Sequence, residues 1–97
     1  MAKRVVWSRD AQLDKLQILQ YWARRLGNKT YSAKLEKRFY HAASLVGRMQ
    51  GLGKRVKDRE ERAYIVGDYE LYYKIYADFI EILRVWDTRR NPEDLKL

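Results

Sequence analysis

The stretch that decides the fold reads YELYYKIYADFIEILRVWDTRRNP, residues 69–92. Its first seven residues alternate apolar and polar side chains, which is the period of a strand with one buried face. A short link then allows a tight hairpin, and residues 79–86 form the next strand. Asp87, Arg89 and Arg90 follow directly. A functional site placed there would lie at the rim of a sheet, on its most rigid element.

The strand over residues 79–86 does not alternate cleanly, because Ile80, Ile82, Leu83 and Val85 are all apolar. Two arrangements fit this pattern. Either both faces of the strand are covered, as in a central strand, or a β-bulge lies near Ile82 and Leu83.

Two amphipathic helices are expected upstream of this hairpin. After a short strand at residues 5–7, apolar side chains recur every three or four positions until Gly27 ends the pattern. The core face expected for this first helix consists of Leu13, Leu16, Leu19, Trp22, Ala23 and Leu26. A second stripe of the same period follows over residues 31–49. The link between the helices is only a few residues long, so they are expected to form an antiparallel αα-hairpin.

Residues 54–62, KRVKDREER, are dense in charge of both signs. They predict an exposed loop that leads into a strand at residues 63–66. Neither half of the chain has enough apolar surface to fold alone, so residues 1–97 are expected to form one domain. The predicted fold class is α+β, with the order β-α-α-β-β-β, an antiparallel sheet that includes the first strand, and the αα-hairpin packed on one face.

The composition limits the function classes. Lys and Arg number 21 against 13 Asp and Glu, a net charge of +8, which favours an anionic partner such as nucleic acid or an acidic protein. Cysteine is absent and only one histidine is present, so thiol chemistry is excluded and no metal site or cofactor is expected. No apolar run approaches the roughly 20 residues of a membrane span, and no signal peptide is visible.

Three short motifs occur in an order and at a spacing that resemble a known family. They are the strand and helix over residues 5–26, the segment Gly67-Asp68-Tyr69 with residues 72–75, and the closing strand and polar tail over residues 80–92. Together, in a basic chain of this length, they resemble the RelE/ParE superfamily of bacterial type II toxin–antitoxin systems, which includes plasmid stabilisation proteins. The resemblance covers essentially the whole chain.

The resemblance implies a cytoplasmic toxin that a cognate antitoxin holds inactive by wrapping around it. It leaves the target open. RelE-like members cleave mRNA on the ribosome, whereas ParE-like members inhibit DNA gyrase by protein–protein contact. Whether the chain is an enzyme depends on this choice. A basic RNA-binding module without toxicity is kept as a third hypothesis, because the net charge and half-exposed tyrosines would support it.

Metal-independent RNA cleavage needs a general base, an acid and cations that stabilise the transition state. The resemblance makes Arg89, Arg62 and Glu61 the candidate catalytic set of such an endoribonuclease. The chain departs from the RelE-like pattern in two places: Glu70 stands where many relatives carry Arg, and no His or Tyr follows Arg90. These departures favour a ParE-like or atypical toxin.

Several side chains are candidates for contacts with nucleic acid or a protein partner. A phosphate contact and a structural ion pair with Glu81 or Glu70 explain Arg84 equally well. For Arg89, a local ion pair with Asp87 is the alternative to a catalytic role. The candidates are Lys54, Arg55, Lys57, Arg59, Tyr72, Lys74, Arg84 and Arg90.

Overall fold

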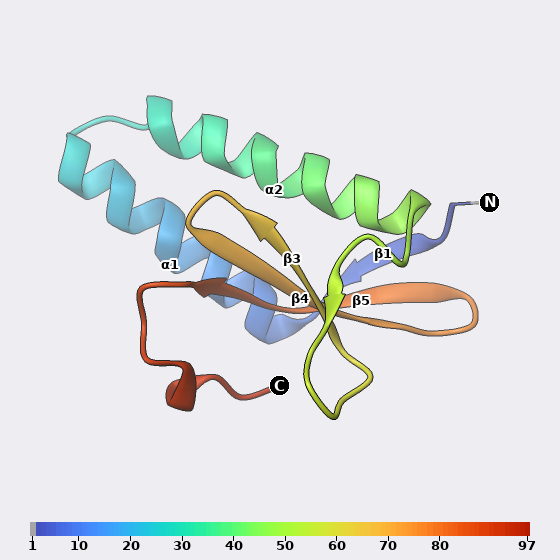
Figure 1. Ribbon diagram of the computed structural model, residues 1–97. Coiled ribbons are helices and arrows are strands. Elements are labelled where there is room, and N and C mark those ends of the chain that lie inside the picture. The colour runs from blue at the N-terminus through green and yellow to red at the C-terminus, as the bar shows by residue number, and fades with distance from the viewer. Residues whose placement is uncertain (1) are drawn as a thin grey trace.

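Two long helices and a five-stranded sheet make up the computed structural model, which describes residues 2–97 (Figure 1). The elements in chain order are β1 (Arg4–Trp7), α1 (Arg9–Leu26), α2 (Thr30–Arg48), β2 (Lys54–Arg55), β3 (Arg62–Val66), β4 (Tyr69–Ile75), β5 (Phe79–Asp87) and a 3-10 turn, η1 (Pro92–Asp94). The predicted α+β class and element order are confirmed. The addition is β2, which lies within the predicted loop and pairs with β3.

The sheet has the strand order β1-β5-β4-β3-β2. Strands β2 to β5 pair antiparallel through successive connections, but β1 pairs parallel to β5, with Val5 opposite Ile80. The sheet is therefore mixed, and the prediction of an entirely antiparallel sheet is wrong for this pair. The reason is the connection: a hairpin forces neighbouring strands to run in opposite directions, whereas the long crossover through α1 and α2 allows a parallel pair.

A β-bulge interrupts β5, which is one of the two arrangements that the sequence predicted. Tyr72 lies opposite Arg84, but Tyr73 lies opposite Ile82, so Leu83 is an extra residue in β5. The bulge lets Ile82 and Val85 face the same side although they are three residues apart. Both are buried, at 0% and 2% exposure.

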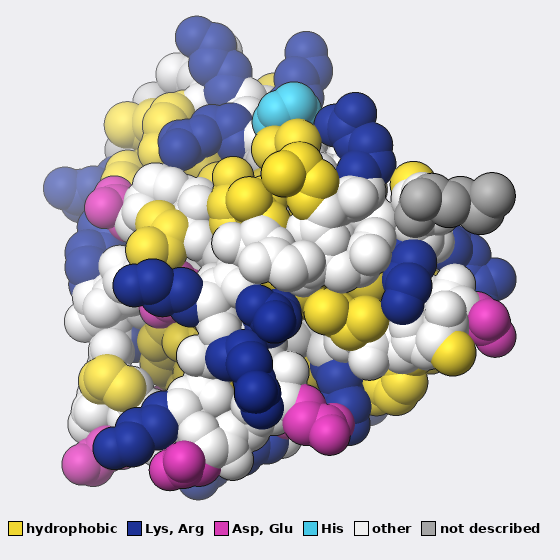
Figure 2. All heavy atoms as spheres, turned by 45° about the vertical axis from the view of Figure 1, so that its right-hand side comes forward, with side chains coloured by type: hydrophobic (Ala, Val, Ile, Leu, Met, Phe, Trp, Pro, Cys, Tyr) yellow, Lys and Arg dark blue, Asp and Glu magenta, His cyan; other side chains and the backbone are white. Residues whose placement is uncertain are grey.

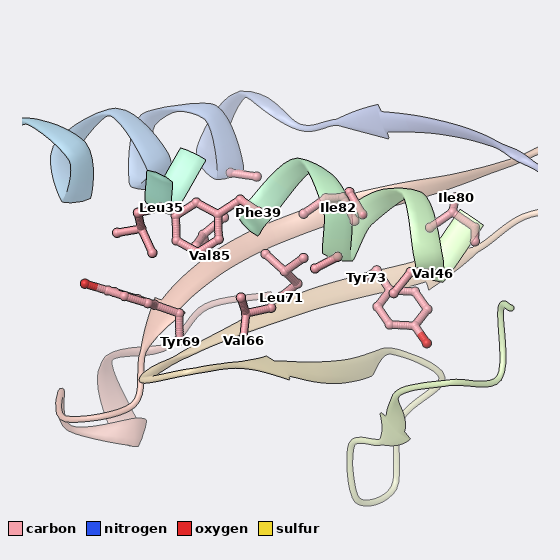
Figure 3. Close-up of a cluster of buried hydrophobic side chains, with 13 residues drawn as sticks. Leu35, Phe39, Val46, Val66, Tyr69, Leu71, Tyr73, Ile80, Ile82 and Val85 are labelled. Atoms are coloured by element: carbon pink, nitrogen blue, oxygen red, sulfur yellow. The ribbon is translucent and has the colours of Figure 1, made fainter. Parts of the chain in front are cut away.

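The core lies between α2 and the sheet (Figure 3). Its large buried side chains are Leu35, Phe39 and Val46 of α2 and Leu71, Tyr73, Ile80 and Ile82 of the strands. The hydroxyl of Tyr73 is satisfied at the end of this core, because it donates to the Gln50 carbonyl at 2.7 Å and accepts from the Gly53 N–H at 2.9 Å. A Cβ at Gly53 would lie 2.8 Å from that hydroxyl, so glycine is favoured here.

Helix α1 buries less of its apolar stripe than predicted. Leu13, Leu16 and Leu26 are 44%, 49% and 48% exposed, and the only fully buried residue of α1 is Ala11. The physical reason is the position of α1: it packs against α2 and β5, while α2 takes the centre of the sheet face. Within residues 2–97, no helix combines the length and the apolar character that crossing a bilayer requires.

Candidate functional site at the end of β5

A cleft of about 400 Å³ lies between α1 and the end of β5. Its α1 side carries Asp14, Tyr21 and Trp22, and its sheet side carries Tyr69, Asp87, Arg89 and Arg90. The cleft therefore lies at the strand end that the sequence marks as a candidate site, and α1 supplies its second wall.

Polar groups of Ser8, the N-cap of α1, and of Asp14 within α1 complete the edge of β5 where β1 ends. The Ser8 backbone N–H donates to the Ile82 carbonyl at 2.9 Å, and the Ser8 hydroxyl donates to the Leu83 carbonyl at 2.9 Å. Further along the helix, the Asp14 carboxylate accepts the Val85 N–H at 3.0 Å. Because these groups replace a neighbouring strand, the end of β5 is held firmly although it lies at the sheet edge.

The Asp14 carboxylate also holds Arg84. It accepts Arg84 Nε at 2.7 Å and Nη2 at 2.9 Å, and Arg84 Nη1 donates to the Lys96 carbonyl at 3.1 Å. The two side chains are only 17% and 11% exposed, and the hydrogen bond to Asp14 raises the pKa of Arg84. The predicted pairing of Arg84 with Glu81 or Glu70 is therefore wrong, because α1 supplies the acid. Arg84 ties α1, β5 and the C-terminal segment together.

Arg89 forms the predicted local ion pair with Asp87. Its Nε and Nη2 donate to the two carboxylate oxygens at 2.9 and 2.8 Å, and its backbone N–H donates to the same group at 2.9 Å. Hydrogen bonding by Arg89 lowers the pKa of Asp87, so this carboxylate is charged at neutral pH. The Arg89 side chain is still 57% exposed, and the neighbouring Arg90 guanidinium lies 4.5 Å from the centre of the Trp86 ring. The positively charged side chains of Arg89 and Arg90 therefore both line the cleft.

Aromatic side chains form the inner wall of the cleft. Trp22 Nε1 donates to the Tyr69 hydroxyl at 2.8 Å, and the Trp22 ring meets Tyr21 and Tyr31 edge-on at 5.1 Å each. From the sequence, Trp22 and Tyr69 were expected only to pack, and Asp14 was missed. Asp14, Ile18 and Tyr21 recur at helical spacing, so a second face of α1 was the signal that could have shown the cleft.

The predicted catalytic set does not converge. Asp87, which carries the Arg89 pair, lies opposite Tyr69, whereas Arg62 lies opposite Tyr73. Those two positions are four residues apart on β4, or about 13 Å along the strand. Arg62 and Glu61 are therefore at the other end of the sheet from Arg89. There Arg62 donates to the Gly53 carbonyl at 2.7 Å.

Glu61 is also a poor general base in this arrangement. Arg59 donates two hydrogen bonds to it at 2.8 and 3.2 Å, which lowers the pKa of Glu61 to about 2. A carboxylate with so low a pKa accepts protons weakly at neutral pH. The geometry thus offers no single site in which Arg89, Arg62 and Glu61 act together.

Most of the predicted contact residues lie near this opposite end, around β2 and the loop that follows it. Lys74 faces Glu60 at 3.7 Å, Arg59 is engaged by Glu61, and Tyr72 donates to Glu70 at 3.3 Å. Lys54, Arg55 and Lys57 are exposed. Figure 2 shows Lys and Arg side chains spread over one face of the molecule among fewer acidic ones. Within residues 2–97, no group of three or more acidic or histidine side chains could hold a metal ion.

Comparison with known protein families identifies the family to which this chain belongs. The family described as ParE toxin of type II toxin-antitoxin system, parDE, matches residues 5–92, from β1 to the start of η1. The chain belongs to the ParE toxin family. This confirms the predicted RelE/ParE resemblance, and the match includes both walls of the cleft.

A solved structure shares the fold of this ParE-family chain. The structure described as the chromosomal ParDE TA system from P. aeruginosa aligns with a TM-score of 0.79 over 91% of this chain and 98% of that one, at 16% sequence identity. At this identity the likeness shows the fold alone. Among curated proteins, none matches the chain significantly.

Proposed function

We propose that this ParE-family chain is the toxin of a two-protein module in the cytoplasm, that a cognate antitoxin holds it inactive, and that it stops growth by binding DNA gyrase. The cleft beside β5 is the proposed contact surface. Its exposed cations and aromatic wall suit a protein–protein contact, because Arg, Tyr and Trp are the residue types that dominate binding energy at interfaces.

The separation of Arg89 from Arg62 and Glu61 is the observation that favours gyrase binding over RNA cleavage. A general base, an acid and a phosphate-binding cation must meet at one phosphate to cleave RNA. Here Arg62 lies about 13 Å along the sheet from Asp87, the partner of Arg89, and the base candidate Glu61 has a pKa of about 2. A toxin that acts by binding needs no such convergence.

The test is to induce the chain alone in bacteria and follow thymidine and amino-acid incorporation side by side. Gyrase inhibition predicts that DNA synthesis stops first. We expect Arg89→Ala to weaken toxicity more than Lys54→Ala at matched expression, because only Arg89 lies at the cleft. Equal loss from both variants would contradict the role of the cleft and indicate diffuse electrostatics.

Ribosome-linked mRNA cleavage is the second candidate, and the exposed arginines at the end of β5 favour it. Protein synthesis stopping before DNA synthesis would support it. A basic RNA-binding module without toxicity is the third: it predicts no growth arrest and no short acidic protein encoded beside the chain.

A further inference from the structure

A second hollow, on the later turns of α1, adjoins the cleft at the end of β5. It has a volume of about 430 Å³, and every residue that lines it is exposed. The lining residues are Gln17, Gln20, Tyr21, Arg24 and Arg25. Gln17 and Tyr21 also line the cleft, so the two hollows form one continuous surface. This surface, named here the α1–β5 surface, extends from the last turn of α1 to Arg89 and Arg90.

The α1–β5 surface carries positive charge that neighbouring acids do not balance. The two carboxylates of the cleft are each paired with an arginine, and no carboxylate of residues 2–97 lines the second hollow. In the same part of the chain, Arg24, Arg25 and Arg90 form no ion pair. Three positive charges are therefore available to an anionic partner.

The residue types in the second hollow distinguish between anionic partners. Arg, Gln and Tyr are among the side chains that donate hydrogen bonds to the phosphate oxygens of DNA, and all five lining residues are of these types. An amphipathic acidic peptide needs an apolar strip against which to bury its own apolar face. No Leu, Ile, Val or Met of the described residues lines this hollow, so its chemistry fits a phosphate backbone better.

We propose that the α1–β5 surface binds the sugar–phosphate backbone of DNA without reading its sequence. Arg24 and Arg25 contact phosphates at the end of α1, and Arg90 contacts a phosphate beside the cleft. The inference rests on the proposed function in one respect, since it identifies this DNA as the segment that gyrase holds while the chain is bound to the enzyme.

The basic region around β2 is the competing surface for DNA. Its cations alternate with acids, because Asp58, Glu60 and Glu61 lie in the loop between β2 and β3. Glu61 is paired with Arg59, and Glu60 lies 3.7 Å from Lys74. A DNA backbone that approaches this region meets like charge as well as opposite charge, so we expect DNA to bind the α1–β5 surface more tightly.

The test compares two double substitutions that remove the same charge from the two regions. Arg24→Gln/Arg25→Gln changes the α1–β5 surface, and Lys54→Gln/Lys57→Gln changes exposed residues around β2. Each variant lowers the net charge of +8 by two. Glutamine has nearly the helix propensity of arginine, and circular dichroism establishes that both variants fold.

Binding to a fluorescein-labelled DNA duplex of about 20 base pairs is measured by fluorescence anisotropy over a range of salt concentrations. The logarithm of the association constant falls with the logarithm of the salt concentration, with a slope of about −0.9 for each phosphate contact. We expect Arg24→Gln/Arg25→Gln to make this slope shallower by about 2 and to weaken binding about tenfold or more near 0.1 M salt. Lys54→Gln/Lys57→Gln is expected to change both quantities by less than half as much.

Three results would overturn the proposal. Equal losses from the two variants would show that net charge alone attracts DNA, and no binding at the lowest salt concentration would exclude a DNA contact. The third result concerns an acidic protein as the partner. A polyglutamate peptide of about 20 residues is added as a competitor, and displacement of the duplex at concentrations no higher than unlabelled duplex requires would assign the surface to acidic protein.

The assay contains no gyrase, so its outcome is separable from the proposed function. If the chain binds DNA through Arg24 and Arg25 but does not inhibit supercoiling, the proposed function fails and the DNA-binding surface stands. If the chain inhibits supercoiling but does not bind DNA, this inference fails and the proposed function stands.

Discussion

The Asp14 carboxylate is expected to be one of the most important single polar groups for stability. Asp14→Ala removes the acceptor of the Val85 N–H and of two Arg84 donors, at 3.0, 2.7 and 2.9 Å. It leaves the Arg84 guanidinium, in a side chain only 17% exposed, without its acid. The substitution therefore removes the hydrogen bond at the end of β5 and the carboxylate that positions Arg84, whose guanidinium also contacts the Lys96 carbonyl of the C-terminal segment.

The magnitude follows from burial. Removing one partner of a buried ion pair costs about 3–5 kcal/mol, whereas an exposed pair contributes about 0–1 kcal/mol. Since the Asp14 side chain is 11% exposed, we place the loss near the lower end of the buried range, at about 3 kcal/mol. For a domain of this size, that lowers the thermal midpoint by about 12–24 °C.

The assay is urea and thermal unfolding followed by circular dichroism. Glu60→Gln is the matched control, because Glu60 is 80% exposed and lies 3.7 Å from Lys74. A double-mutant cycle with Arg84→Met separates the pair from the Val85 hydrogen bond and is expected to give a coupling energy of about 1.5–3 kcal/mol. A loss for Asp14→Ala no larger than that of Glu60→Gln would refute the structural role of Asp14.

Two other predictions concern the opposite end of the sheet. Gly53→Ala should lower the free energy of unfolding by about 1–3 kcal/mol, because the added Cβ would lie 2.8 Å from both the Ala63 carbonyl and the Tyr73 hydroxyl; unfolding in urea measures it, and an unchanged midpoint would contradict the close approach. Acid should destabilise the protein through Glu61, whose pKa falls from 4.5 to about 2 on pairing with Arg59. A carboxyl group whose pKa is lower in the folded than in the unfolded protein stabilises the fold at pH values above its unfolded-state pKa. This contribution to the free energy of unfolding is therefore lost as the pH falls from about 5 towards 2. Glu61→Gln should make the loss of stability between those pH values smaller, and an identical acid profile in both proteins would show that Glu61 contributes nothing.

The fold could be predicted where the local pattern determines it. The period of two in β4 and the end of α1 at Gly27 follow from apolar spacing and from glycine chemistry, and the bulge at Leu83 is one of the two arrangements that the apolar spacing in β5 allowed. The parallel pairing of β1 could not be predicted, because direction across a long crossover is set by how the helices pack and not by residues 5–7. The exposure of Leu13 escaped prediction for a related reason: a helical stripe shows which face is apolar, but not whether the core or a partner covers it.

The candidate site was predictable in its place but not in its partners. The polar end of β5 marked Arg89 and its pairing with Asp87, since two residues of opposite charge lie two positions apart. The acid for Arg84 is 70 residues away in the chain, at Asp14, and no local pattern indicates it. The same limit explains the catalytic set: the family resemblance grouped Arg62 and Glu61 with Arg89, whereas the strand register places Arg62 and Glu61 at the other end of the sheet.

The most direct test of the proposed gyrase mechanism is an in vitro comparison with purified protein. The chain is added to ATP-dependent supercoiling by DNA gyrase and, separately, to ribosomes carrying a defined mRNA, with Arg89→Ala as the matched variant in both. Gyrase binding through the cleft predicts that the chain inhibits supercoiling, that Arg89→Ala inhibits less, and that the mRNA stays intact. Cleavage of the mRNA on the ribosome with supercoiling unaffected would contradict this mechanism and return Arg89 to the role of a catalytic cation.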